Sequence, residues 1–233
     1  MKQSESDKML GKIFRDISKK YGWNSRRGFI FKKDSLLFFS ILINGQPKTK
    51  RLSWSLTYKY YEFDDLFWKI VKLEENLKQP LSFRACGVWG VPGIEIDGDY
   101  KILDKWDETQ ILEQVENIIQ KIDTIANDLS VSVKSPKDNL KLVEKLHKSF
   151  LERYPDALRD IWMEKILTNL LLDNVELADE IARSRVKVND TGGFNSDGKS
   201  FYELVIRYLK GSGTTAFQFK SIYRSIISHF TGR

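Results

Sequence analysis

The sequence is poor in the residues that build disulfides and zinc sites. Its 233 residues include one cysteine and two histidines, which excludes an intrachain disulfide framework and favours a reducing compartment. Structural zinc takes four ligands, mostly Cys and His at short spacings, and Cys86, His147 and His229 do not stand at such spacings. We therefore predict no bound metal and no cofactor.

Long apolar runs are also lacking. The longest extends from Leu36 to Ile43 and is interrupted by Ser40, whereas a membrane-spanning helix needs about 20 predominantly apolar residues. The start, Met1 to Lys8, has no apolar stretch of the kind that a secretory signal contains. We expect a cytoplasmic protein that does not associate with membranes.

Recognisable catalytic sets are missing as well. Gly192-Gly193 and Gly211-Ser212-Gly213 lack the lysine and the preceding strand of a phosphate-binding loop. A nucleophilic Cys86 would need a base beside it, and the sequence does not supply one. We predict no catalytic residues, and the expectation is that the protein is not an enzyme.

The chain does have the means to build a core and an uneven distribution of charge. Aromatic residues make up 12% of it. Residues 1–60 contain 14 Lys and Arg against 4 Asp and Glu, whereas residues 61–133 contain 7 against 15. The contrast has two interpretations: complementary surfaces within one fold, or a basic face for an acidic partner.

Strand periodicity dominates the first half. From Arg51 to Tyr60 apolar and polar residues alternate, which places Leu52 and Leu56 on a core face and Arg51 and Lys59 toward water or a partner. Asn44-Gly45 and Asp97-Gly98 are typical of hairpin turns. Leu81 to Cys86, after Pro80, is predicted as a further strand.

Helical periodicity precedes, interrupts and follows these strands. Glu62 to Leu77 is predicted as a helix within the sheet half, and Asp107 is predicted to cap a long helix that carries Ile111, Val115 and Ile118. From Pro136 onward only helices are expected, the last over 216–230. The sequence thus predicts an α+β fold: an antiparallel sheet domain with flanking helices over 1–133 and a helical domain over 134–233.

The acidic segment from Glu95 to Asp99 has two interpretations. Glu95, Asp97 and Asp99 followed by Lys101 resemble the carboxylates and lysine of some metal-dependent nucleases, where the carboxylates hold a cation and the lysine polarises the nucleophile. Asp97-Gly98-Asp99 is also ordinary turn chemistry. A metal-dependent hydrolase is therefore one alternative function.

Nucleic-acid binding is a second alternative. Basic residues crowd the two N-terminal hairpins together with aromatic residues, and these could neutralise phosphates and stack on bases. The basic residues are Arg26, Arg27, Lys32, Lys33, Lys48, Lys50, Arg51 and Lys59, and the aromatic ones are Trp23, Phe29, Phe31 and Tyr58. The simpler interpretation is a solvated basic face with the rings in the core.

Three motifs give the N-terminal half a resemblance to a known family. They are Tyr21-Gly22-Trp23 at the end of the first helix, Gly28-Phe29-Ile30-Phe31 in the first strands, and Asp104-Lys105-Trp106 before a helix. In this order, over about residues 8–129, they resemble a bacterial family of domains of unknown function. The family usually has a second tryptophan where this chain has Asp107.

The resemblance implies no assigned activity. Proteins of this general kind include bacterial accessory factors, among them immunity proteins that neutralise a toxin and need only a binding surface. Our leading hypothesis is a non-enzymatic binding protein that contacts a protein partner through Lys48, Arg51 and Lys59, or through Glu95, Asp97 and Asp99.

Overall fold

The computed structural model describes residues 2–26, 28–86, 90–156 and 160–211. The predicted helix over 216–230 lies outside these residues. The chain divides into two compact units, Met1–Trp68 with Glu74–Leu146 and Lys69–Leu73 with His147–Arg233. The predicted domain boundary near residue 133 remains a prediction.

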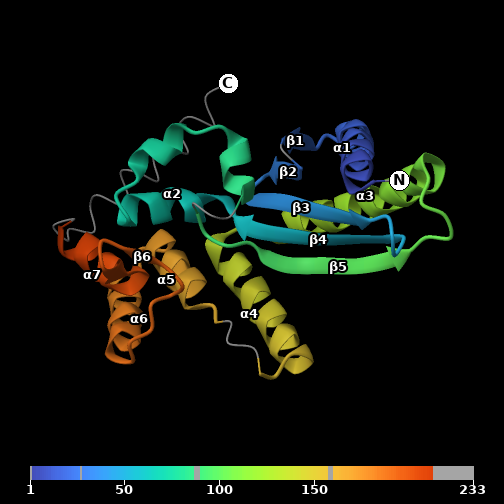
Figure 1. Cartoon of the computed structure of the whole chain (residues 1–233). Coiled ribbons are helices and arrows are strands. Elements are labelled where there is room, and N and C mark those ends of the chain that lie inside the picture. Colours follow the sequence, from blue (N-terminus) through green and yellow to red (C-terminus); the bar gives the residue numbers. More distant parts are fainter. Residues whose placement is uncertain (1, 27, 87–89, 157–159, 212–233) are drawn as a thin grey trace. The chain divides into compact units, whose positions relative to one another are not determined.

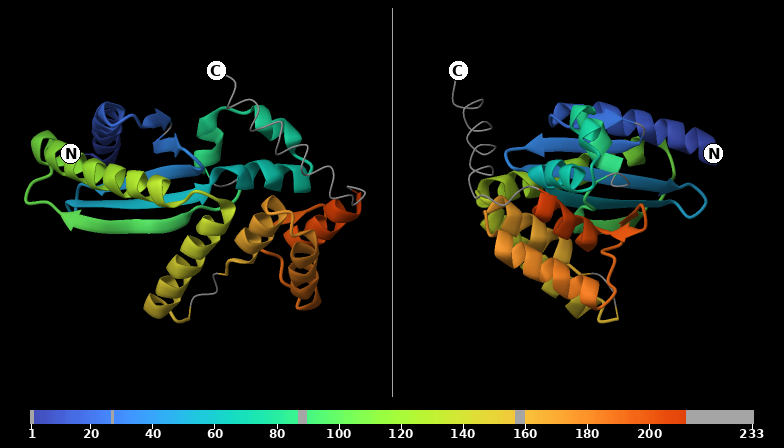
Figure 2. Two further views of the ribbon diagram at one scale, coloured as in Figure 1. Left: turned by 180° about the vertical axis from the view of Figure 1, so that it is seen from behind. Right: turned by 90° about the vertical axis from the view of Figure 1, so that its left-hand side faces the viewer.

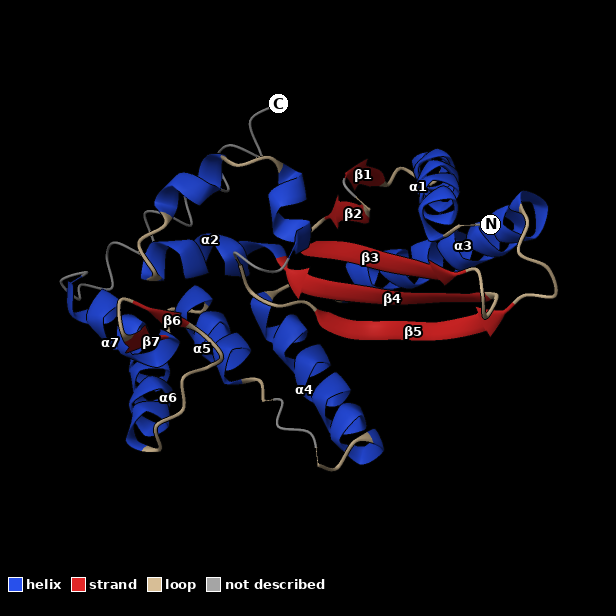
Figure 3. Ribbon diagram, viewed as in Figure 1, coloured by secondary structure: helices blue, strands red, loops and turns tan. Residues whose placement is uncertain are grey.

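The first unit contains a five-stranded antiparallel sheet in which each strand pairs with the next along the chain (Figures 1 and 3). Its strands are β1 (Asn24–Arg26), β2 (Phe29–Asp34), β3 (Leu37–Gln46), β4 (Arg51–Tyr60) and β5 (Ile94–Ile102). The alternation predicted for β4 is confirmed: Leu52, Leu56, Tyr58 and Tyr60 are buried together. This sheet and the helical second half confirm the predicted α+β class.

Two helices lie on one face of this sheet. They are α1 (Gln3–Lys20) and α3 (Glu108–Ser132), which pack against each other and cover the fully buried Phe39, Ile41 and Leu56. The Asp107 carboxylate accepts a hydrogen bond of 2.9 Å from the Gln110 amide, which confirms the predicted cap. We call this side the helix-covered face.

On the opposite side, the uncovered face, the described residues of the first unit place no long helix. In Figure 1 strands β3 to β5 face the viewer bare, and the reverse view in Figure 2 shows α3 across them. At one end of this face lies η2 (Leu81–Cys86), a 3-10 helix in contact with β2. The remaining elements are α2 (Tyr61–Ile70), η1 (Glu74–Lys78) and α4 (Pro136–Arg153), which continues into the second unit.

Four predictions about local structure are wrong. Leu81–Cys86 is a 3-10 helix, and the helix that begins near Glu62 ends at Ile70. Asp97-Gly98 lies inside the continuous strand β5, where a bulge opposite Leu56 and Thr57 adjusts the register. Asn44-Gly45 lies inside β3. There the glycine is required by close approach: a Cβ on it would meet the Trp106 ring at 2.8 Å.

The second unit is mostly helical. It contains α5 (Trp162–Leu171), α6 (Val175–Lys187) and α7 (Phe201–Gly211), and α6 packs against both of the others. A short hairpin of β6 (Asn195–Ser196) and β7 (Lys199–Ser200) precedes α7, in a part of the chain for which the sequence predicted no strands. Its turn, Asp197-Gly198, has positive φ at both residues.

None of the helices in the residues that the structure describes is long and apolar enough to cross a membrane.

Candidate binding surface

The uncovered face of the sheet has two different ends, and β4 extends through both. At the end that we call the closed end, η2 and residues 90–93 lie over the sheet. At the other, which we call the open end, Leu42, Asn44, Arg51, Ser53, Tyr100 and Ile102 have no such cover. Cross-strand pairing puts Leu42 beside Ser55, Ser53 beside Tyr100 and Arg51 beside Ile102, so these side chains share one face.

A small apolar cluster fills the closed end. Phe31 and Phe38 project from the sheet and pack with Ala85 of η2, and Leu81 and Tyr61 pack against them. Phe31 and Phe38 are almost parallel, with ring centroids 6.1 Å apart. Because packing within this cluster holds η2 against the sheet, the charged side chains nearby are also buried.

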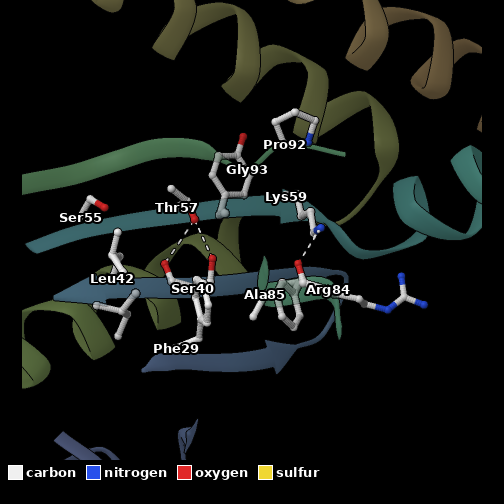
Figure 4. A pocket seen from close by; sticks show the side chains of 13 residues that line it. Phe29, Ser40, Leu42, Ser55, Thr57, Lys59, Arg84, Ala85, Pro92 and Gly93 are labelled. Carbon is white, nitrogen blue, oxygen red and sulfur yellow. Dashed lines mark hydrogen bonds between the residues drawn. The ribbon is translucent and has the colours of Figure 1, made fainter. Parts of the chain in front are cut away.

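Lys59 lies at the centre of the closed end and is 6% exposed. Its Nζ lies 2.8 Å from the Asp64 carboxylate and donates hydrogen bonds to the carbonyls of Arg84 (3.0 Å) and Val91 (3.1 Å) (Figure 4 shows the Arg84 bond). Three acceptors match the three donors of an ammonium group. The prediction that Lys59 faces water or a partner is therefore wrong.

Asp64 joins the elements of the closed end. Its carboxylate, which is completely buried, also accepts hydrogen bonds from the Val91 amide (2.8 Å) and from the Arg84 guanidinium (3.4 Å). Arg84 lies over the Tyr61 ring at 4.0 Å and forms an ion pair with Asp65. Burial raises the pKa of the Tyr61 phenol, and the charge of Arg84 opposes this rise.

Between the two ends the uncovered face is hollowed. A pocket of about 250 Å³ is lined by side chains that include Phe29, Ser40, Leu42, Ser55 and Thr57 (Figure 4). The Ser40 and Thr57 hydroxyls are 2.8 Å apart, and Thr57 also donates to the Ser40 carbonyl at 3.3 Å. Lys59 and Arg84 of the closed end also line this pocket, so its wall combines apolar groups and neutral hydroxyls with two buried basic side chains.

The open end exposes apolar surface beside a positive charge. Leu42 is 43% exposed, Tyr100 53% and Ile102 56%. The Arg51 guanidinium lies 4.1 Å from the centre of the Tyr100 ring. Lys48 is exposed in the turn that leads into β4. The sequence pointed to Lys48 and Arg51 but missed the three apolar residues, although Tyr100 and Ile102 alternate with Asp99 and Lys101.

The acidic residues of β5 do not form a common site. Glu95 is exposed on the uncovered face opposite Thr57, whereas Asp97 lies on the helix-covered face opposite Leu56. Asp97 accepts hydrogen bonds from Trp54 Nε1 (3.2 Å) and Lys121 Nζ (2.7 Å). Within the described ranges, no three His, Cys, Asp or Glu side chains lie where they could share a metal ion.

The rings invoked for base stacking are mostly in the core. Trp23, Phe31 and Tyr58 are 3%, 5% and 1% exposed. Lys32 pairs with Asp123 of α3 at 2.9 Å, and Lys50 donates to the Asp104 carbonyl. Basic side chains of the N-terminal quarter are thus bound in part by groups of the acidic middle segment within the same fold.

No protein-family profile, curated protein or solved structure matches this chain.

Proposed function

We propose that this chain is a non-enzymatic binding protein whose open end receives a protein partner. One observation carries the proposal: Leu42, Tyr100 and Ile102 are all exposed on one face of the sheet, which no long helix among the described residues of the first unit covers. Protein interfaces combine exposed apolar side chains with polar ones, and here Ser53 and Ser55 of β4 lie between the apolar residues. The adjoining pocket offers a place for an anchoring side chain.

The charges around the open end indicate the chemistry of the partner. Lys48 and Arg51 are both exposed at the same end of the sheet. The Tyr100 ring holds the Arg51 guanidinium above the apolar surface, so less side-chain freedom is lost when a partner binds. The matching partner segment has apolar residues at its centre and Asp or Glu at its rim.

An accessory or immunity protein fits this description, since neutralising a toxin requires only a surface that covers it. The resemblance of the N-terminal half supports the same class. In this proposal Arg51 and Lys48 take part in binding, whereas the buried Lys59 supports the fold.

Site-specific photo-crosslinking in living cells tests the surface. A photoreactive amino acid in place of Leu42 is expected to capture one acidic partner, whereas the same group in place of Leu112 on α3 is not. The two leucines are a matched pair, because each is 43% exposed. Equal capture of the same proteins at both positions would contradict the assignment of the surface.

The purified partner then tests the chemistry. Arg51→Glu combined with Lys48→Glu is expected to weaken its binding about tenfold or more, since like charges replace complementary ones. Lys12→Glu, at an exposed residue of α1 on the helix-covered side, is the control and should have little effect. If the partner is a toxin, its expression alone should stop growth and coexpression of this chain should restore it.

Binding to nucleic acid is the competing outcome. Titration with single-stranded DNA and RNA at low and high salt separates the two, because phosphate contacts weaken steeply as salt rises. We expect no binding at either salt concentration. Tight, salt-sensitive binding that is lost in Arg51→Glu would show that this surface binds nucleic acid, and it would contradict the proposal of a protein partner.

A further inference from the structure

Strand β5 is an edge of the sheet, since no strand among the described residues pairs with its outer side. The sheet order ends at β5, which spans nine residues and pairs with β4. Every residue from Gly98 to Ile102 is exposed. A long, exposed edge carries a row of backbone donors and acceptors that can pair with another strand. The other edge, β1, has three residues.

The hydrogen bonds show which residues of β5 point outward. The backbone amide of Tyr100 donates to the carboxylate of its own neighbour, Asp99, at 2.7 Å. This amide therefore points away from β4. Since successive residues of a strand direct their backbone groups to opposite sides, the backbone groups of Gly98 and Ile102 point outward as well.

We propose that β5 pairs antiparallel with β5 of a second copy of this chain, in a register centred on Tyr100. In this register Asp99 of each copy stands opposite Lys101 of the other, so two pairs of opposite charge form by symmetry. Gly98 stands opposite Ile102, and Tyr100 opposite Tyr100. A two-fold interface uses the same surface on both subunits, which requires such self-complementarity.

The faces of β5 agree with this register. Asp99 and Lys101 lie opposite Trp54 and Leu52 of β4, on the helix-covered face. Tyr100 lies opposite Ser53, on the uncovered face. The charges of the two copies therefore meet on one face of the joined sheet, and the exposed apolar side chains meet on the other.

Neighbouring registers lack this complementarity. In an antiparallel pair, two directly opposed residues point to the same face of the sheet. The two-fold axis of the dimer must therefore pass between a residue of β5 and the same residue of the other copy, so the nearest alternatives to Tyr100 are its neighbours Asp99 and Lys101. A centre at Asp99 places that carboxylate against its copy, and a centre at Lys101 places two ammonium groups together. Like charges in opposition destabilise strand pairing, so among these three registers only the one centred on Tyr100 is favourable.

Asp99 makes the association reversible. In a single chain its carboxylate accepts the outward Tyr100 amide, so that donor has a partner without a second copy. On pairing, the amide donates to the Tyr100 carbonyl of the other copy, and the carboxylate is released to face Lys101. One set of hydrogen bonds replaces another, and the short paired segment predicts a weak dimer.

Sedimentation velocity over a range of concentrations tests the dimer with a charge exchange. Asp99→Lys alone and Lys101→Asp alone each oppose like charges twice, and each is expected to weaken the dimer about tenfold or more. An equimolar mixture of the two variants is expected to form a heterodimer as tight as the wild-type dimer. Circular dichroism confirms that both variants are folded.

Tyr100→Pro gives a second test that does not depend on charge. Proline removes the outward amide without removing a hydrogen bond to β4, so the fold is retained and the dimer is lost. A wild-type chain that stays monomeric at all concentrations overturns the proposal, as does a charge-exchange mixture that does not associate. The charge-reversal sites, Asp99 and Lys101, are separate from Leu42 and Arg51, so this result and the crosslinking result are independent.

Discussion

Lys59 and Arg51 are both basic residues of β4, and their side chains project from the same face of the sheet. Lys59 is buried among three hydrogen-bond acceptors, whereas Arg51 is exposed above the Tyr100 ring. The difference comes from η2 and residues 90–93, which lie over one end of the face only. One face of one strand therefore contributes a buried charge network at its closed end and an exposed basic and apolar surface at its open end.

The largest expected effect tests the buried end of this comparison. Asp64→Ala leaves Lys59 without its carboxylate and removes one acceptor from Arg84, and it should lower the free energy of unfolding by about 4 kcal/mol. Urea unfolding monitored by tryptophan fluorescence measures the change. Glu116→Ala is the control, since its ion pair with Lys20 is exposed on both sides, at 38% and 61%. The loss there should be below about 1 kcal/mol, and equal losses would contradict the comparison.

The two basic residues themselves give the next effect. Lys59→Met retains most of the side-chain volume but leaves the Arg84 and Val91 carbonyls without their donor and Asp64 without one of its two basic partners. Because Arg84 still pairs with Asp64, the free energy of unfolding should fall by about 3 kcal/mol, less than for Asp64→Ala. Arg51→Met should change it by about 0.5 kcal/mol or less, because the site is exposed. Urea midpoints of the two variants compare them directly. A larger loss of unfolding free energy for Arg51→Met than for Lys59→Met would contradict the assignment of Lys59 as the residue that supports the fold.

Gly90→Ala tests how tightly the closed end is packed. A Cβ at this position would meet Asp64 Oδ1 at 2.5 Å, and that oxygen is held by Lys59 and Val91. The substitution should cost about 1 to 3 kcal/mol of unfolding free energy through overpacking. Gly11→Ala is the control, since nothing lies within 4 Å of a Cβ there. A wild-type midpoint for Gly90→Ala would show that the closed end can relax.

The smallest effect is a pH dependence at the closed end. Because burial raises the pKa of Tyr61 in the folded chain, the unfolded state loses this proton first as the pH rises. Stability from this group is therefore fully present below the unfolded pKa of about 10 and is lost above it. Tyr61→Phe should make thermal unfolding less sensitive to pH between roughly pH 9 and 11. An unchanged slope would assign the alkaline sensitivity to other groups.

Sequence patterns succeeded where one local rule governs the outcome. The alternation of β4 identified its core face, and Asp107 caps α3 as predicted. They failed where distant segments meet. Asn44-Gly45 favours a turn, but its glycine is present because α1 and Trp106 pack against β3. Asp97-Gly98 likewise favours a turn, yet pairing with β4 extends through it as one strand.

The candidate surface was predicted only in part. Arg51 and Lys48 were identified because basic residues are conspicuous in a sequence. Leu42 could not be separated from its buried neighbour Ile41, since both belong to one apolar run and only the placement of the helices decides which face is covered.

The sequence by itself determined the α+β class, the core face of β4 and the concentration of positive charge in the first quarter of the chain. These follow from periodicity and composition, which are local properties. Only the tertiary structure decided that Lys59 is buried, that Arg51 is exposed and that β5 is an open edge. Each depends on which segments, distant along the chain, come to lie over the sheet or beside it, and packing sets that arrangement.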